Sequence, residues 1–159
     1  GRSRKEEVFY GCILVLKWAA MCSFPEVKKV LIVDEDPEMR ILLGHLLELG
    51  EYLPIIALDA EDGFQKLLQE RPDVILLAVM LDSQGRLKMF EGIKQDERFR
   101  HIPVVLMSAV EERHLYQLRV LPQLSGSDLL PRPEGFLGRP PEVEELLRLV
   151  HRLSRSGGP

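Results

Sequence analysis

An unbroken apolar run from Val74 to Leu81 is the feature that most limits what this chain can fold into. The run follows a Pro72-Asp73 turn signal, and its apolar residues show no helical spacing. Its length and its branched side chains are typical of a β-strand that is buried on both faces. Such strands lie at the centre of parallel sheets, where helices cover both faces of the sheet. The run therefore predicts an α/β fold.

The segments on either side of this run alternate between strand-like and helix-like patterns. We predict further strands at residues 28–33, 54–58, 102–107 and 135–138. Helices are predicted at residues 37–50, 60–70, 87–95, 111–121 and 142–153. Asp36 is a favourable N-cap for the first helix, and Pro37 suits its first turn. The residues expected to face inward from these helices include Leu42, Leu49, Leu68 and Val143. The alternation argues for an open parallel sheet covered on both faces.

Composition limits the class of protein and its compartment. The chain has 159 residues, enough for one domain with a sizeable core and an appendage. Its net charge of -4 gives no basic surface for nucleic acid. Cys12 and Cys22 form neither a disulfide framework nor a metal-binding spacing, so a reducing, cytoplasmic location is expected.

Residues 8–24 form an apolar segment that Lys17 interrupts. A membrane anchor, the tail of an upstream domain and an extra helix all fit this pattern. We favour an extra helix that packs on the domain or on a second copy, because an exposed apolar helix would be adhesive. The chain then divides into an N-terminal extension (1–27), a domain (28–153) and a tail (154–159).

Ligands of open parallel sheets bind at the carboxyl ends of the strands. The residues predicted there are Asp34 and Glu35 after the first strand, Ala78 in the third and Ser108 after the fourth. Together with the residue that follows the fifth strand, they form the candidate site.

These motifs resemble, by their order and spacing, the receiver domains of two-component response regulators. The resemblance covers most of residues 28–153 and depends on Asp34-Glu35, Pro72-Asp73 with the apolar run, Ser108-Ala109 and a basic residue before proline. It implies a doubly wound, flavodoxin-like sheet of five strands in the order 2-1-3-4-5. It also implies a magnesium ion on the acidic pair and a phosphoryl-accepting aspartate at the end of the third strand, where this chain has Ala78. The serine would contact the phosphoryl group.

The basic position of the family, a lysine before proline, has two candidates here. Arg139 in the sequence Phe136-Leu137-Gly138-Arg139-Pro140 is preferred, because this register also places Phe136 at the family's switch aromatic. Arg132, before Pro133, is the alternative. Since a guanidinium favours bidentate pairing with carboxylates, we predict that one of these arginines pairs with the acidic pair in place of the metal.

Ala78 cannot accept a phosphoryl group or bind a metal, so the resemblance becomes that of a degenerate pseudo-receiver. Loss of one carboxylate also removes much of the magnesium affinity, so no cofactor and no enzymatic activity are expected. Asp82 is open to two interpretations, a displaced acceptor or the cap of a turn with Ser83 and Gly85.

The expected function is a phosphorylation-independent module of bacterial two-component signalling that acts through protein partners. In the family, the partner and dimer surface comprises the fourth helix, fifth strand and fifth helix, which are residues 111–121, 135–138 and 142–153 here. Homodimerisation is one expected use of it, and neither nucleic acid nor membrane is an expected partner. Three alternatives stay open: an ordinary phospho-accepting receiver in which Ala78 replaces the aspartate, a membrane-tethered regulator, and a small-molecule-binding or phosphohydrolase-like domain on the same fold.

Overall fold

The computed structural model of the chain describes residues 27–79, 84–109 and 132–156. The apolar segment 8–24, Asp82 and the helix predicted at 111–121 lie outside these residues. The strands are β1 (Lys29–Val33), β2 (Leu53–Ala57), β3 (Val74–Ala78), β4 (Val104–Ser108) and β5 (Gly135–Gly138). The described helices are α2 (Pro37–Leu49), α3 (Ala60–Glu70), α4 (Gln84–Gln95) and α7 (Val143–Ser156).

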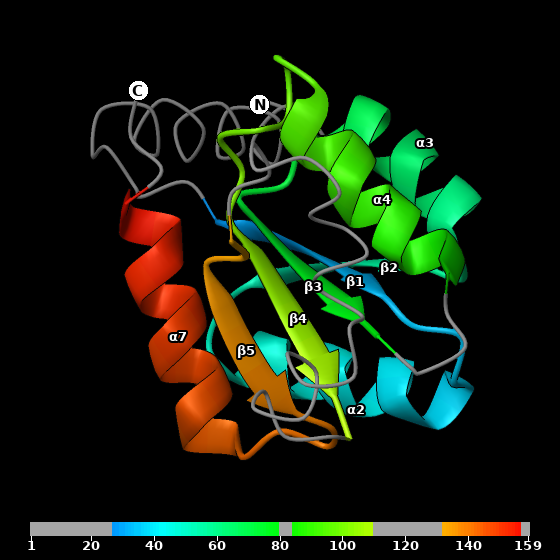
Figure 1. Cartoon of the computed structure of the whole chain (residues 1–159). Helices are drawn as coiled ribbons and strands as arrows, with labels where there is room; N and C mark the ends of the chain where they lie inside the picture. The colour runs from blue at the N-terminus through cyan, green and yellow to red at the C-terminus, as the bar shows by residue number, and fades with distance from the viewer. Residues whose placement is uncertain (1–26, 80–83, 110–131, 157–159) are drawn as a thin grey trace, which may run out of the picture.

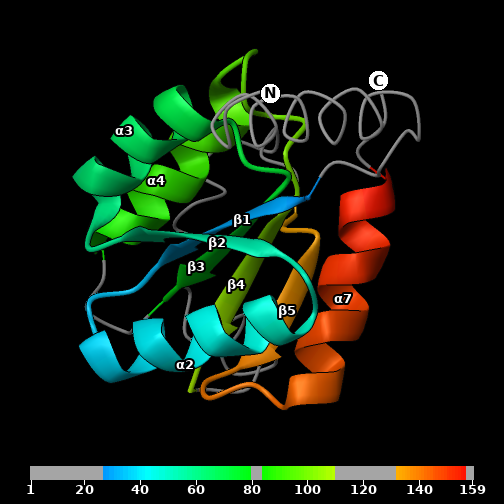
Figure 2. The same cartoon turned by 180° about the vertical axis from the view of Figure 1, so that it is seen from behind.

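The five strands form one parallel sheet in the order β2-β1-β3-β4-β5. Helices α3 and α4 cover one face of the sheet, and α2 and α7 cover the other (Figures 1 and 2). The predicted fold class, a doubly wound receiver-like sheet, is confirmed. The apolar run contributes the central strand β3, in which every residue is buried.

Two hydrophobic clusters, one on each face of the sheet, make up the core. Side chains of β1 and β3 enter the clusters alternately: Leu31 and Ile75 lie in one, Ile32 and Leu76 in the other. Ala78, fully buried, belongs to the cluster beneath α2 and α7. Residues that alternate between two buried faces explain why the sequence of β3 is apolar throughout.

The ends of α2 follow their sequence signals. The Asp36 side chain accepts a hydrogen bond of 3.0 Å from the backbone N–H of Glu38, and Pro37 occupies the first turn. Gly50 caps the other end, where a Cβ atom would lie only 2.6 Å from Cδ2 of Leu147 on α7. Glycine at this position therefore allows the two helices to approach each other.

Four leucine and valine side chains expected to face inward are exposed instead. Leu42, Leu49, Leu68 and Val143 have exposed fractions of 40%, 74%, 54% and 43%. Each helix rests on a single sheet face, so only a narrow stripe, such as Leu43, Leu46 and Leu47 of α2, reaches the core. The predicted apolar stripe was too wide.

Two helices also extend beyond their expected bounds. Helix α4 begins at Gln84 instead of residue 87, and α7 continues to Ser156. Ser154, which is predicted to belong to the tail 154–159, is buried and therefore packs against the domain as part of α7. Among the described helices, none is both long and apolar enough to cross a membrane.

Candidate functional site

The candidate site lies at the carboxyl ends of the strands. Strand register pairs Val33 with Leu77, so the next residues along each strand, Asp34 and Ala78, are neighbours at this edge. Ser108, the last residue of β4, pairs with Gly138, and Arg139 follows directly. The sheet thus brings together residues that are widely separated in the sequence.

Arg139 binds Asp34 through two hydrogen bonds. Its Nε donates to Oδ2 at 3.1 Å and its Nη2 donates to Oδ1 at 2.9 Å. The same Nη2 lies 3.4 Å from Oδ2 of Asp36. Only 1% of the Asp34 side chain and 11% of the Arg139 side chain are exposed, so water screens this pair little. The hydrogen bonds to Asp34 raise the pKa of the Arg139 guanidinium above its ordinary value, and the group stays charged.

Of the two candidates for the basic position, Arg139 is the residue that the structure places beside Asp34. Arg132 precedes β5 and therefore lies toward the amino ends of the strands, at the other edge of the sheet. The Arg139–Pro140 peptide bond is cis. The ion pair with Asp34 that the sequence predicts is present, and Asp36 is a further carboxylate on the guanidinium.

Arg40 shapes the backbone of the site from α2. Its Nη1 donates to the carbonyl oxygens of Asp34 and Glu35, both at 2.9 Å. The Asp34 carboxylate also accepts a 2.9 Å hydrogen bond from the N–H of Asp36, a local turn that aspartate favours. Sequence reasoning missed Arg40, although a cation in the first turns of a helix, where the dipole disfavours it, is an available signal.

The other predicted site residues lie nearby with different degrees of burial. Ala78 is fully buried and Ser108 is 6% exposed. Phe136 is half-buried in β5 and packs against the cluster that α3 and α4 cover. Glu35 follows Asp34 in the loop that Arg40 holds.

The site does not fit a magnesium ion. Magnesium requires near-octahedral oxygen ligands, usually carboxylates and water. Both oxygens of Asp34 already accept hydrogen bonds, Ala78 supplies a methyl group, and the Arg139 guanidinium places positive charge against Asp34. Within the described ranges, no cluster of three or more His, Cys, Asp or Glu residues could hold a metal.

A second charged pair lies at the amino ends of the strands, opposite the end that carries Asp34. The Lys94 ammonium, whose side chain is fully buried, pairs with Oε1 of Glu134 and donates to the carbonyl oxygen of Ile102 at 3.1 Å. Oε2 of Glu134 accepts a 2.7 Å hydrogen bond from the N–H of Val104. These contacts join α4, the entry to β4 and the entry to β5. No sequence pattern predicts these contacts, because Lys94 and Glu134 are 40 residues apart in the chain.

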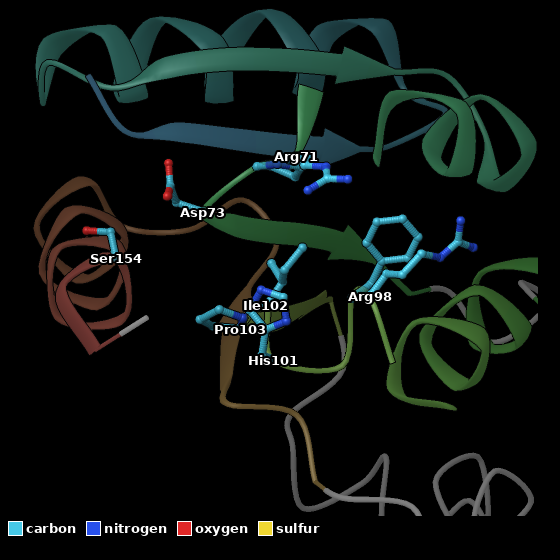
Figure 3. A pocket seen from close by; sticks show the side chains of 9 residues that line it. Arg71, Asp73, Arg98, His101, Ile102, Pro103 and Ser154 are labelled. Atoms are coloured by element: carbon cyan, nitrogen blue, oxygen red, sulfur yellow. The ribbon is translucent and has the colours of Figure 1, made fainter. Parts of the chain in front are cut away.

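A small pocket of about 150 Å³ opens at this same end of the strands, between the start of β3 and the approach to β4 (Figure 3). Arg71 and His101 line it with exposed side chains, and Asp73 accepts a hydrogen bond from Lys29 N at 2.8 Å. Arg98 is paired with Asp96 through two hydrogen bonds of 2.8 and 3.1 Å. Asp73 and Arg98 are therefore engaged in contacts of their own, and the pocket is remote from Asp34.

Comparison with known proteins decides the family. The family model described as "Response regulator receiver domain" matches residues 30–135, more than half of the chain. The chain belongs to the response regulator receiver family. It is a receiver module of two-component signalling, as the motifs at the strand ends implied.

Curated relatives match most of this chain. RpaA of Synechocystis, a DNA-binding dual master transcriptional regulator, is 31% identical over 127 residues, which are 80% of this chain and 49% of RpaA. The transcriptional regulatory protein CpxR of Escherichia coli is 30% identical over 126 residues, 79% of this chain and 51% of CpxR. This receiver chain therefore spans about half the length of these relatives.

Solved structures share the fold at low identity. A sensor protein from Polaromonas sp. JS666 superposes with a TM-score of 0.69 at 19% identity, covering 82% of this chain and 98% of that one. The chemotaxis protein CheY4 of Vibrio cholerae gives a TM-score of 0.66 at 20% identity, covering 80% and 98%. At these identities the likeness shows the receiver fold alone.

Proposed function

We propose that this receiver domain acts without being phosphorylated at the family's acceptor position. The observation that carries the proposal is Ala78 at the end of β3, beside Asp34. A methyl group has no oxygen to accept a phosphoryl group. The receiver is therefore a degenerate one and not an enzyme, and it needs no magnesium.

Arg139 supplies the positive charge that a metal would otherwise provide. In receivers a cation offsets the acidic residues at the strand ends, and here the guanidinium does so through two hydrogen bonds to Asp34. The pair connects the loop after β1 with the loop after β5 and holds the two in one arrangement. One arrangement is what a constitutive docking module requires, because a partner then meets the same surface at all times.

The partner surface in this proposal includes β5 and α7 together with residues 111–121. The exposed side of α7 carries acidic residues in its first turn, Glu144 and Glu145, and basic residues farther along, Arg148 and Arg155. Segregated charges of this kind favour recognition of a protein of complementary charge. The proposal places the domain in the cytoplasm, with a signalling protein or a second copy as its partner.

Phosphoryl transfer from a small donor tests the proposal directly. We expect no gain of a phosphoryl group in the intact mass of the full chain after incubation with acetyl phosphate and Mg²⁺. CheY4 of Vibrio cholerae, handled in parallel, controls for donor quality. A stable gain on this chain would contradict the proposal and favour a displaced acceptor such as Asp82.

A further inference from the structure

An apolar groove runs along the outer edge of the sheet, between α2 and β2. Figure 2 shows β2 as the edge strand with α2 beside it. The groove has a volume of about 450 Å³, and the residues that line it include Ile41, Gly44, His45, Glu48, Pro54 and Ile56. Ile41 is 61% exposed. The groove lining is mostly apolar and follows an edge strand of the sheet, where another segment can pack.

The floor of the groove is open at Gly44. A Cβ atom built on this helical glycine would meet no atom within 4 Å apart from its immediate surroundings in the helix. Gly44 is itself buried, and it contributes no side chain to the groove, so a segment that packs there meets free space at this position.

Exposed apolar residues also lie where the N-terminal segment joins the domain. Val27, Leu49 and Leu53 are 61%, 74% and 46% exposed. The N–H of Leu53 donates to the carbonyl oxygen of Lys28 at 2.9 Å, so the start of β2 lies beside the entry of the chain into β1. The chain preceding Val27 thus begins beside the amino end of β2, the strand that lines the groove.

We propose that residues 8–24 of the same chain dock in this groove as a helix alongside α2. Lys17 is their only charged residue, so the segment requires an apolar surface to cover it. As a helix, its 17 residues would extend about 25 Å, against about 20 Å for the 13 residues of α2. The described residues that line the groove include one acidic side chain, Glu48, which complements Lys17. They also include one arginine, Arg40, whose guanidinium is held by the carbonyl oxygens of Asp34 and Glu35. The proposal is independent of phosphorylation.

Trp18 makes the docking measurable, because it is the only tryptophan of the chain and belongs to the docking segment. In the unmodified 159-residue chain we expect acrylamide to quench Trp18 about threefold less efficiently than in Ile41→Asp, whose charge would oppose an apolar partner. Leu68→Asp is the matched control. Leu68 is exposed to a similar degree, 54%, but lies on α3 at the opposite face of the sheet, and this variant should quench as the original chain does.

Gly44→Leu provides a second variant that places a side chain in the groove, where a Cβ atom has free space, and favours the helix. It should expose Trp18 as Ile41→Asp does, while far-UV circular dichroism shows both variants folded. Sedimentation velocity gives the oligomeric state of each sample. A protected Trp18 in a monomer supports the proposal. A protected Trp18 in a dimer would assign the groove to a second copy and overturn it. Equal quenching in the original chain, Ile41→Asp and Gly44→Leu would also overturn it.

Discussion

Arg139 and Asp34 stand 105 positions apart in the sequence, yet they form a buried, bidentate ion pair at the edge of the sheet. The pair connects the carboxyl end of the first strand with that of the fifth. Asp34 is 1% exposed, so its charge is offset by Arg139 and by the N–H of Asp36 instead of by water. The stability of the domain should therefore depend on this arginine.

Arg139→Ala should destabilise the domain by about 3 kcal/mol, because it leaves the buried carboxylate of Asp34 without its partner. Urea denaturation followed by far-UV circular dichroism measures the loss. Arg98→Ala is the matched control, since Arg98 makes the same two-bond contact with Asp96 but at the exposed surface. A loss no larger than that of the control would show that the Arg139 pair contributes nothing.

The surface pair of Arg98 and Asp96 predicts a pH dependence of its own. Hydrogen bonds from Arg98 lower the pKa of Asp96 from 3.8 to about 2. A depressed carboxyl pKa contributes stability that is present above pH 3.8 and is lost as the pH falls through about 2. The exposed pair makes this contribution small, so NMR titration of the Asp96 carboxyl carbon is the appropriate measurement. In Arg98→Ala the titration midpoint should return toward the ordinary value, and an unchanged midpoint would refute the assigned cause.

Removing either partner of Lys94 and Glu134 should have unequal effects. Glu134→Ala leaves a fully buried ammonium with only carbonyl oxygens and removes the acceptor for Val104 N–H, and it should cost about 3 kcal/mol. Lys94→Met removes the buried charge and leaves Glu134, whose side chain is 32% exposed, in contact with water. It should cost less, and thermal denaturation of both variants and of the double variant would measure the coupling. Equal losses from the two single variants would contradict this ordering.

Restoring the acceptor tests whether Arg139 also opposes phosphorylation. Ala78→Asp alone should gain no phosphoryl group from acetyl phosphate, because Arg139 would pair with the new carboxylate and leave no room for magnesium. Ala78→Asp combined with Arg139→Lys should gain one, seen by intact mass. Arg139→Lys alone is the control. Phosphorylation of the single Ala78→Asp variant would show that the missing aspartate is the only barrier.

The sequence predicted the fold well, because a sheet buried on both faces leaves a strong local pattern. The apolar run identified β3, and helix α3 has the predicted bounds. Helix faces were less readable: Leu42 and Leu49 are apolar, but the packing of α2 on one face of the sheet decides which of its apolar residues are buried. Local patterns do not contain that information.

The site was partly predictable for a related reason. Asp34 and Arg139 could be assigned because strand ends in a parallel sheet converge at one edge. Arg40 was missed because its partners are backbone carbonyl oxygens, and the only sequence signal is an unfavourable cation near the start of a helix. Lys94 and Glu134 were missed because they belong to no motif, and only the packing of α4 against the entry to β5 brings them together.

The separation of Asp34 and Arg139 also matters while the ribosome is still making the protein. Translation proceeds from the N-terminus at roughly 5–20 residues per second, so the 105 positions between them take roughly 5–20 s. During that interval β2 and β3 are completed and can pair with β1, but Arg139 has not yet been made and cannot offset the charge of Asp34. A hydrated carboxylate resists burial, so the nascent sheet should keep this edge open to water until its fifth strand arrives.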